Sequence, residues 1–260
     1  MKHIGISLAL AGAASHAMAH DTWLAATTRA VQPGAALFFD ITSAEHFPRP
    51  GTSIAPERID QAACRQAGAT TALQTGERGK AALRLSLPNP GPAAATCWVL
   101  LKPRTLDMSP GKVAEYLDEI DAPPSVRQAW QSGARRWHET YTKNAKAMVP
   151  GAARDAAGQV PVGLKLEFVL QTAAAGSPPE LAALVLRDGK PLAGLSVALS
   201  GESGGAPRRV RSDAAGLVRF PAPAAGRWML SATDLRPVNA ADGVWDSQFS
   251  TLVFDVPAGR

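Results

Sequence analysis

The stretch LVLRDGKPLAGLSVALSG, Leu184–Gly201, decides the fold class. Two β-like runs flank Asp188 and Gly189, a pair that favours a tight hairpin turn because both residues tolerate positive φ. The same pattern returns around Asp213–Gly216. About one hundred residues of short strands, with a turn signal about every ten residues, predict an immunoglobulin-like or transthyretin-like β-sandwich over residues 162–260.

Short β-like runs also fill residues 21–108, between Gly- and Pro-rich turn signals. In one of these runs Leu83, Leu85 and Leu87 alternate with polar residues, which is typical of a strand with one face in a core. The other clear runs are Ala36–Thr42 and Thr96–Leu101. We therefore expect a mainly β protein with two β-sandwich domains, residues 20–150 and 162–260.

The region between the two predicted sandwiches has a different pattern. Ser109 followed by Pro110 is typical of a helix start. A longer apolar stripe has spacings of three and four up to Pro150: Trp130, Ala134, Trp137, Tyr141, Ala145 and Met148. This pattern predicts a helical insertion over about residues 110–148, docked on the sandwich by its aromatic side chains. The small, polar residues 151–161 predict a linker.

The N-terminus is typical of a protein exported to the periplasm. Lys2 and His3 precede an apolar run, Ile4–Ala14, and Ala17–Ala19 forms an A-x-A cleavage site. Residues 1–19 are therefore a predicted signal peptide, and cleavage after Ala19 makes His20 the first residue. The apolar run is too short to span a bilayer, so we expect no membrane insertion of the cleaved chain.

Charge and cysteine content narrow the possible partners. The 27 Lys and Arg only modestly exceed the 22 Asp and Glu. The tightest basic cluster, Arg208–Arg211, alternates like a strand edge, so nucleic acid is not an expected partner. The two cysteines, Cys64 and Cys97, lack the paired C-x-x-C spacing of metal–thiolate sites. An even count in an oxidising compartment favours one disulfide between them.

A series of short segments follows one another along the chain: HDTWL from His20, EHFP from Glu45, ETYTKNAKAMV from Glu139, GLKLEFV from Gly163, LRDGKPLAGLSV from Leu186, RSDAAGLVRF from Arg211, GRWML from Gly226 and WDSQFSTLVFDV from Trp245. Taken in this order, they resemble a periplasmic family of domains of unknown function, some of whose members are linked to nickel and cobalt uptake. The resemblance implies an N-terminal sandwich with a helical insertion and a transthyretin-like C-terminal domain.

Once exposed by cleavage, His20 offers two nitrogens to a transition metal, its α-amine and its imidazole Nδ1. His46 is the better second candidate, because it follows a strand at a Pro-rich turn. His138 is either a third ligand or a helix-surface histidine with a satisfied hydrogen bond. Glu45 lies beside His46, and both Glu45 and Asp21 are candidates to orient a metal-binding imidazole from behind. The alternative for Asp21 is a first-strand residue that bonds a turn.

This donor set suits nickel, cobalt, copper or zinc. Together with the resemblance it predicts a non-enzymatic accessory protein that captures nickel or cobalt for a membrane metal-uptake transporter or an outer-membrane receptor.

Two other functions stay open from the sequence. One is a histidine-brace copper oxygenase that uses His20, His46 or His138, and Tyr141. The other is a metal-free structural or adhesion module. The sequence contains no nucleophile elbow, no His-Glu-x-x-His motif and no phosphate-binding loop, which argues against the common hydrolases and nucleotide-dependent enzymes.

Overall fold

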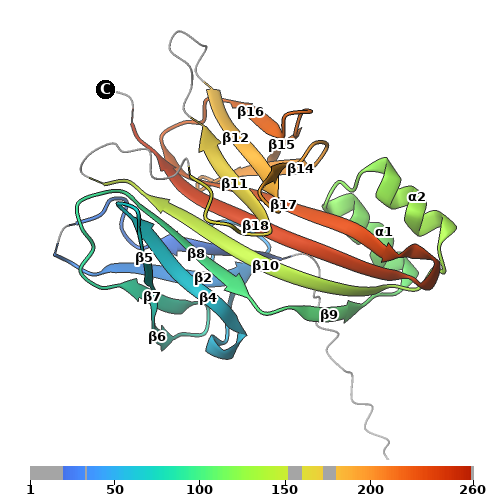
Figure 1. Ribbon diagram of the computed structural model, residues 1–260, viewed down its shortest axis with the longest axis horizontal. Helices are drawn as coiled ribbons and strands as arrows, with labels where there is room; N and C mark the ends of the chain where they lie inside the picture. The colour runs from blue at the N-terminus through green and yellow to red at the C-terminus, as the bar shows by residue number, and fades with distance from the viewer. Residues whose placement is uncertain (1–19, 33, 152–159, 172–179, 259–260) are drawn as a thin grey trace, which may run out of the picture.

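The computed structural model describes residues 20–32, 34–151, 160–171 and 180–258. The predicted signal peptide, residues 1–19, lies outside the described residues. So does most of the predicted linker, residues 151–161. The described chain is mainly β, as the sequence predicts, and its strands form three sheets (Figure 1).

A nine-stranded sheet runs through the whole molecule and belongs to both sandwiches. Its strands follow the order β15-β14-β17-β18-β10-β8-β4-β5, and β9 pairs with β10 beside this path. Their bounds are β4 Ile59–Gln66, β5 Ala69–Ala72, β8 Ala95–Leu101, β9 Arg104–Asp107, β10 His138–Val149, β14 Ser196–Gly201, β15 Arg208–Arg211, β17 Gly226–Asn239 and β18 Val244–Val256.

The junction of the two halves is the pair β10 and β18, which run parallel from His138 opposite Val244 to Ala147 opposite Val253. Figure 1 shows the two long strands side by side across the centre of the molecule. The two predicted sandwiches therefore share one sheet and are not joined by a linker alone.

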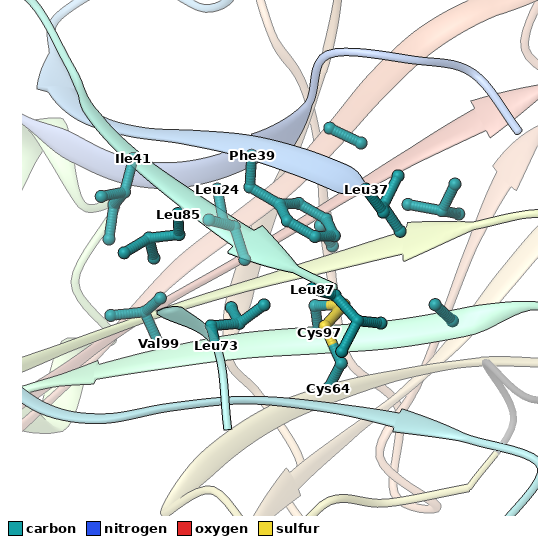
Figure 2. Close-up of a cluster of buried hydrophobic side chains, with 14 of the residues drawn as sticks. Leu24, Leu37, Phe39, Ile41, Cys64, Leu73, Leu85, Leu87, Cys97 and Val99 are labelled. Carbon is teal, nitrogen blue, oxygen red and sulfur yellow. A yellow bond between two sulfur atoms is a disulfide. The ribbon is translucent and has the colours of Figure 1, made fainter. Parts of the chain in front are cut away.

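The N-terminal sandwich closes when a smaller sheet packs on the β4, β8 and β10 part of the long sheet. Its strands are β1 Asp21–Ala26, β2 Leu37–Ala44, β3 Thr52–Ser53, β6 Gln74–Arg78 and β7 Leu83–Leu87. The alternating leucines of β7 are buried, as expected. Cys64 and Cys97 face each other on β4 and β8 and form the predicted disulfide within this core (Figure 2).

The C-terminal sandwich pairs the other end of the long sheet with a third sheet. This sheet contains β11 Leu166–Gln171, β12 Glu180–Arg187, β13 Lys190–Pro191 and β16 Leu217–Pro221. Asp188 and Gly189 have φ of 51° and 73° and form the predicted turn between β12 and β13. The chain then leaves this sheet, because the next long strand, β14, belongs to the nine-stranded one. The turn is local, but the two long strands around it face each other across the core.

Two short helices, α1 Pro110–Glu119 and α2 Pro124–Ser132, pack against β17 and β18 through one aromatic cluster. Helix α1 begins at Pro110 after Ser109, as predicted. Trp130 and Trp137 are buried in the cluster, which confirms their docking role. No helix of the described residues has the length and apolar character needed to cross a membrane.

The predicted helix over residues 138–148 is wrong, because this segment is strand β10. Helix α2 ends at Ser132, and Gly133 follows in extended conformation. A strand at the centre of a sheet with both faces covered loses its polar–apolar alternation, and residues 144–147 are all buried. The apolar spacing of three and four therefore did not reflect a helix here.

Candidate functional site

His20 is held firmly at the start of β1. The next residue, Asp21, already pairs with Ala44 of β2. On the other side, Lys143 Nζ of β10 donates a hydrogen bond of 2.6 Å to the His20 carbonyl. His20 therefore sits where β1, β2 and β10 meet, and it does not belong to a frayed tail.

The imidazole of His20 faces the turn that follows β2. His20 Nε2 lies 3.2 Å from Glu45 Oε1, within hydrogen-bond distance. The other carboxylate oxygen of Glu45 is 4.0 Å from His46 Nε2. Phe47 anchors this turn, because its buried ring packs edge-on against Trp23 of β1 at a centroid distance of 5.6 Å. The structure thus brings together three of the predicted residues: His20, Glu45 and His46.

These side chains are accessible to different degrees. The side chain of His20 is 32% exposed, and those of Glu45 and His46 are 65% and 82% exposed. Within this group, His46 is therefore open to solvent, whereas His20 is mostly covered. Among the described residues, no group of three or more His, Cys, Asp or Glu side chains is arranged to hold a metal ion. A metal at His20 therefore needs a donor besides these side chains.

The structure does not bring His138 to this group. His138 Nδ1 donates to Asp107 Oδ1 of β9 at 2.9 Å, and the side chain is half exposed. Since neighbouring residues of a strand face opposite sides, Glu139 points into the cavity beside His20, and His138 does not line it. The predicted alternative, a surface histidine with a satisfied hydrogen bond, matches this position, although on a strand and not on a helix.

Asp21 also faces away from the His20 imidazole. It lines a small cavity with Glu119, Arg209 and Ser231, and its carboxylate accepts a hydrogen bond from the Ser231 side chain. Burial raises the pKa of the Asp21 carboxyl. Of the two acids expected to orient an imidazole, only Glu45 contacts one.

A cavity of about 300 Å³ opens beside His20. Its wall combines apolar and aromatic side chains from β9, the segment before α1, the second half of α1, β10 and β18 with polar ones from β2, β3, β9 and β10. The lining residues are His20, Ser43, Thr52, Arg104, Leu106, Met108, Tyr116, Glu139, Tyr141, Lys143 and Phe249. A cavity of this size, mixed in character, is typical of a small-ligand site.

Glu139 forms the buried floor of the cavity. Its carboxylate accepts hydrogen bonds from Tyr116 Oη at 3.1 Å and from Trp137 Nε1 at 2.8 Å, and a third from Ser247 Oγ. Burial raises the pKa of the Glu139 carboxyl, while these hydrogen bonds oppose the shift. Burial also raises the pKa of the Tyr116 hydroxyl well above its usual value. Because three donors hold its carboxylate, Glu139 forms a fixed polar floor of the cavity.

Lys143 occupies the wall between His20 and the aromatic cluster. Its Nζ lies 4.9 Å from the centroid of the Phe249 ring, a cation–π contact. Burial lowers the pKa of Lys143 to about 8, and the negative charges of Asp21, Glu139 and Glu119 oppose this shift. The Lys143 amine holds the His20 backbone in place and provides a positive charge near His20.

Sequence reasoning missed Lys143, Glu139 and Arg104 as residues of the site. Tyr141 was considered only for the copper-oxygenase alternative, and it does line the cavity with His20. Glu139, Tyr141 and Lys143 are two residues apart, so once the segment is known to be a strand they fall on one face of β10. The predicted helix concealed this arrangement.

Comparison with known proteins assigns the chain to a family. A family model described as a domain of unknown function, DUF4198, matches residues 17–234. No curated protein matches the sequence.

Among solved structures, native alpha-2-macroglobulin from Escherichia coli, spanning domains MG0-NIE-MG1, is 13% identical, with a TM-score of 0.23 over 90% of this chain and 97% of that one. Fibronectin(III)-like modules of Clostridium thermocellum CbhA are 8% identical, with a TM-score of 0.19 over 90% of this chain and 94% of that one. At these TM-scores neither likeness carries an argument about function. The family match covers most of the sequence, and the chain belongs to the DUF4198 family of domains of unknown function.

Proposed function

We propose that this protein is a periplasmic metal-binding accessory protein, which captures a divalent transition metal, nickel or cobalt, at His20 and delivers it to a membrane uptake transporter or an outer-membrane receptor. The observation that carries the proposal is the contact between His20 and Glu45 at a fixed strand start. Ordering a free tail costs about 1–2 kcal/mol per residue in backbone entropy. The Lys143 contact and the β1 pairing reduce that cost at His20.

The donor atoms fit a transition metal once the chain is cleaved after Ala19. Cleavage provides the α-amine of His20, which is the additional donor that the side chains alone do not supply. The Glu45 carboxylate binds Nε2 of the ring and leaves Nδ1 as the nitrogen next to the amine. A hydrogen bond to the non-coordinating nitrogen is the usual way in which proteins orient a metal-binding imidazole. His46 is available as a further donor from the exposed side.

The exposure of the group also suits a carrier. A site that passes its metal to a partner needs ligands that the partner can reach, and His46 is the most exposed of the three side chains. By the general affinity order copper binds such nitrogen donors more tightly than nickel or cobalt, so selection of nickel or cobalt depends on supply and on the partner.

The test is isothermal titration of Ni²⁺, Co²⁺, Cu²⁺ and Zn²⁺ into protein processed to start at His20. The comparison protein carries one additional residue before His20, which removes the free amine from this position. We expect tight binding that the added residue abolishes. His138→Ala is the matched control and leaves binding unchanged, since His138 bonds Asp107 and lies outside the site. Equal binding in both proteins would mean that the metal binds without the His20 amine, and absent binding in both would favour a metal-free structural or adhesion module. Either result contradicts the proposal.

A second function, that of a histidine-brace copper oxygenase, is favoured by one observation. Tyr141 lines the same cavity as His20, so a phenol stands near the candidate metal position. His138 is not available for a brace there, and His46 would have to supply the second imidazole. Copper-loaded protein that generates no peroxide with a reductant and oxygen rules this function out.

A further inference from the structure

A second cavity, of about 270 Å³, adjoins the first and carries an unusual concentration of positive charge. The two cavities share five lining residues: Ser43, Thr52, Arg104, Tyr141 and Lys143. Arg58 and Arg78 line the second one. The His20 site therefore continues into a chamber bordered by three arginines: Arg104 where the two cavities meet, and Arg58 and Arg78 farther from His20.

These three arginines differ from most others in the described chain, because none of them is ion-paired with a carboxylate of the described residues. The arginines with such a partner are Arg29, Arg84, Arg127, Arg187, Arg211, Arg219, Arg227 and Arg236. Charge next to a cavity that no protein carboxylate neutralises is available to a ligand.

Arg58 provides the most specific observation. Its Nη2 donates to the Lys102 carbonyl at 3.1 Å, which fixes the guanidinium. Its Nε is buried and has no hydrogen-bond partner among the described residues. A buried donor without a partner is costly, and native proteins seldom leave one unexplained. Arg58 therefore borders the second cavity while its hydrogen-bonding capacity is not fully used within the described residues.

The remaining lining fits an oxygen-rich organic anion. Guanidinium groups bind carboxylates through paired hydrogen bonds with matched geometry. The hydroxyl groups of Ser43, Thr52 and Ser53 offer further donors along the chamber. Leu106 and Met108 give the carbon skeleton an apolar wall at the His20 end.

A bare metal cation is a poor sole occupant of this chamber. The arginine end repels a divalent cation, whereas an anion bound there attracts one toward His20. We propose that the two cavities together bind a small organic polycarboxylate, so that the metal reaches His20 as a complex with this chelator. The link to the metal rests on the function proposed above, but the binding of the anion does not require it.

The test compares three ligands on protein processed to start at His20: citrate alone, Ni²⁺ alone, and a one-to-one nickel–citrate mixture. We expect nickel–citrate to bind about ten- to one-hundred-fold more tightly than citrate alone. The variants are Arg104→Gln, at an exposed position, and Arg58→Gln, at the orphaned donor. Each should weaken citrate and nickel–citrate by about tenfold and should not weaken Ni²⁺ alone, because loss of a positive charge does not disfavour a cation. Arg136→Gln is the matched control, since Arg136 is exposed and lines neither cavity.

The outcomes separate the two proposals. If citrate and nickel–citrate bind the variants as they bind the unmodified protein, the polycarboxylate site is wrong, whatever Ni²⁺ alone does. If nickel–citrate binds no more tightly than citrate alone, delivery as a complex is also wrong. If Ni²⁺ alone does not bind but citrate binds in an arginine-dependent way, the anion site stands and the metal function fails. Arg104→Gln keeps the test valid if Arg58→Gln does not fold.

Discussion

Strand β10 carries two largely buried lysines, and the protein compensates their buried positive charges in different ways. Lys146 and Glu167 are both 1% exposed and form an ion pair with a Nζ–Oε1 distance of 2.6 Å. Lys143, three residues earlier and so on the opposite face, has no carboxylate partner among the described residues and contacts a carbonyl and an aromatic ring. On the sealed face of β10, toward the C-terminal sandwich, the lysine charge is buried and neutralised by an ion pair. On the open face, toward the N-terminal sheet, the lysine borders a cavity.

The two lysines illustrate two kinds of charge: one is ion-paired inside the protein and stabilises the fold, and the other faces a cavity and is available to a ligand. Glu167 also accepts hydrogen bonds from the backbone N–H groups of residues 162–164, so it secures the entry into β11 as well as Lys146. Every charge there has its partner within the protein. The charges around His20 are arranged otherwise: Lys143 and Arg104 border a cavity that a ligand can enter, and Glu45 contacts the His20 ring.

The largest expected effect is at the sealed face. Glu167→Gln leaves the Lys146 charge buried without its counter-charge, and such changes cost about 3–5 kcal/mol of unfolding free energy. Urea denaturation measures the loss. The matched control is Glu180→Gln, which removes a partly exposed partner of the exposed Arg219 at 3.8 Å and should cost less than about 1 kcal/mol. A loss for Glu167→Gln no larger than that of the control would mean that the two faces of β10 do not differ as described.

A smaller effect is expected at the open face, in its pH dependence. Because the pKa of Lys143 is lowered from 10.5 to about 8, the folded protein binds fewer protons than the unfolded chain between these two values. Stability from this group is therefore gained as the pH rises through that window, by at most about 3 kcal/mol. We expect the unmodified protein to gain stability relative to Lys143→Met over this range, in metal-free samples followed by denaturant unfolding. If the unfolding free energies of the two proteins changed in parallel with pH, the lowered pKa of Lys143 would be contradicted.

The smallest effect is expected at the floor of the cavity. Tyr116→Phe removes one of the three donors to the Glu139 carboxylate and should cost about 1–2 kcal/mol near neutral pH. Because burial has raised the pKa of Glu139, the carboxyl takes up a proton as the pH falls, and the cost should shrink in acid. Thermal unfolding at several pH values follows this change. A cost that is independent of pH would mean that the charge of Glu139 plays no part.

Much of the fold follows from local sequence, and most of the site does not. The Asp188–Gly189 turn, the helix start at Pro110 and the Cys64–Cys97 bond follow from turn chemistry, capping preference and cysteine count. Strand β10 was missed because both of its faces are buried, which removes the alternation that identifies a strand.

The His20 group was predictable in part, since Glu45 and His46 follow a recognisable strand and the hairpin-like pairing of β1 with β2 returns them to His20. Lys143 reaches His20 only through the position of β10, which its parallel pairing with β18 helps to fix. Arg58 and Arg104 come from still other segments. No local pattern encodes such distant contacts, so these residues were found only in the structure.

The most direct test of the central claim, that His20 beside the open face of β10 binds a metal, is a crystal structure of the protein processed to start at His20 and loaded with Ni²⁺, with anomalous scattering recorded at the nickel edge. We predict an anomalous peak between the α-amine and Nδ1 of His20, while Nε2 of the same ring keeps its contact with Glu45. A peak at His138 and Asp107 instead, or no peak at any protein site, would contradict the account.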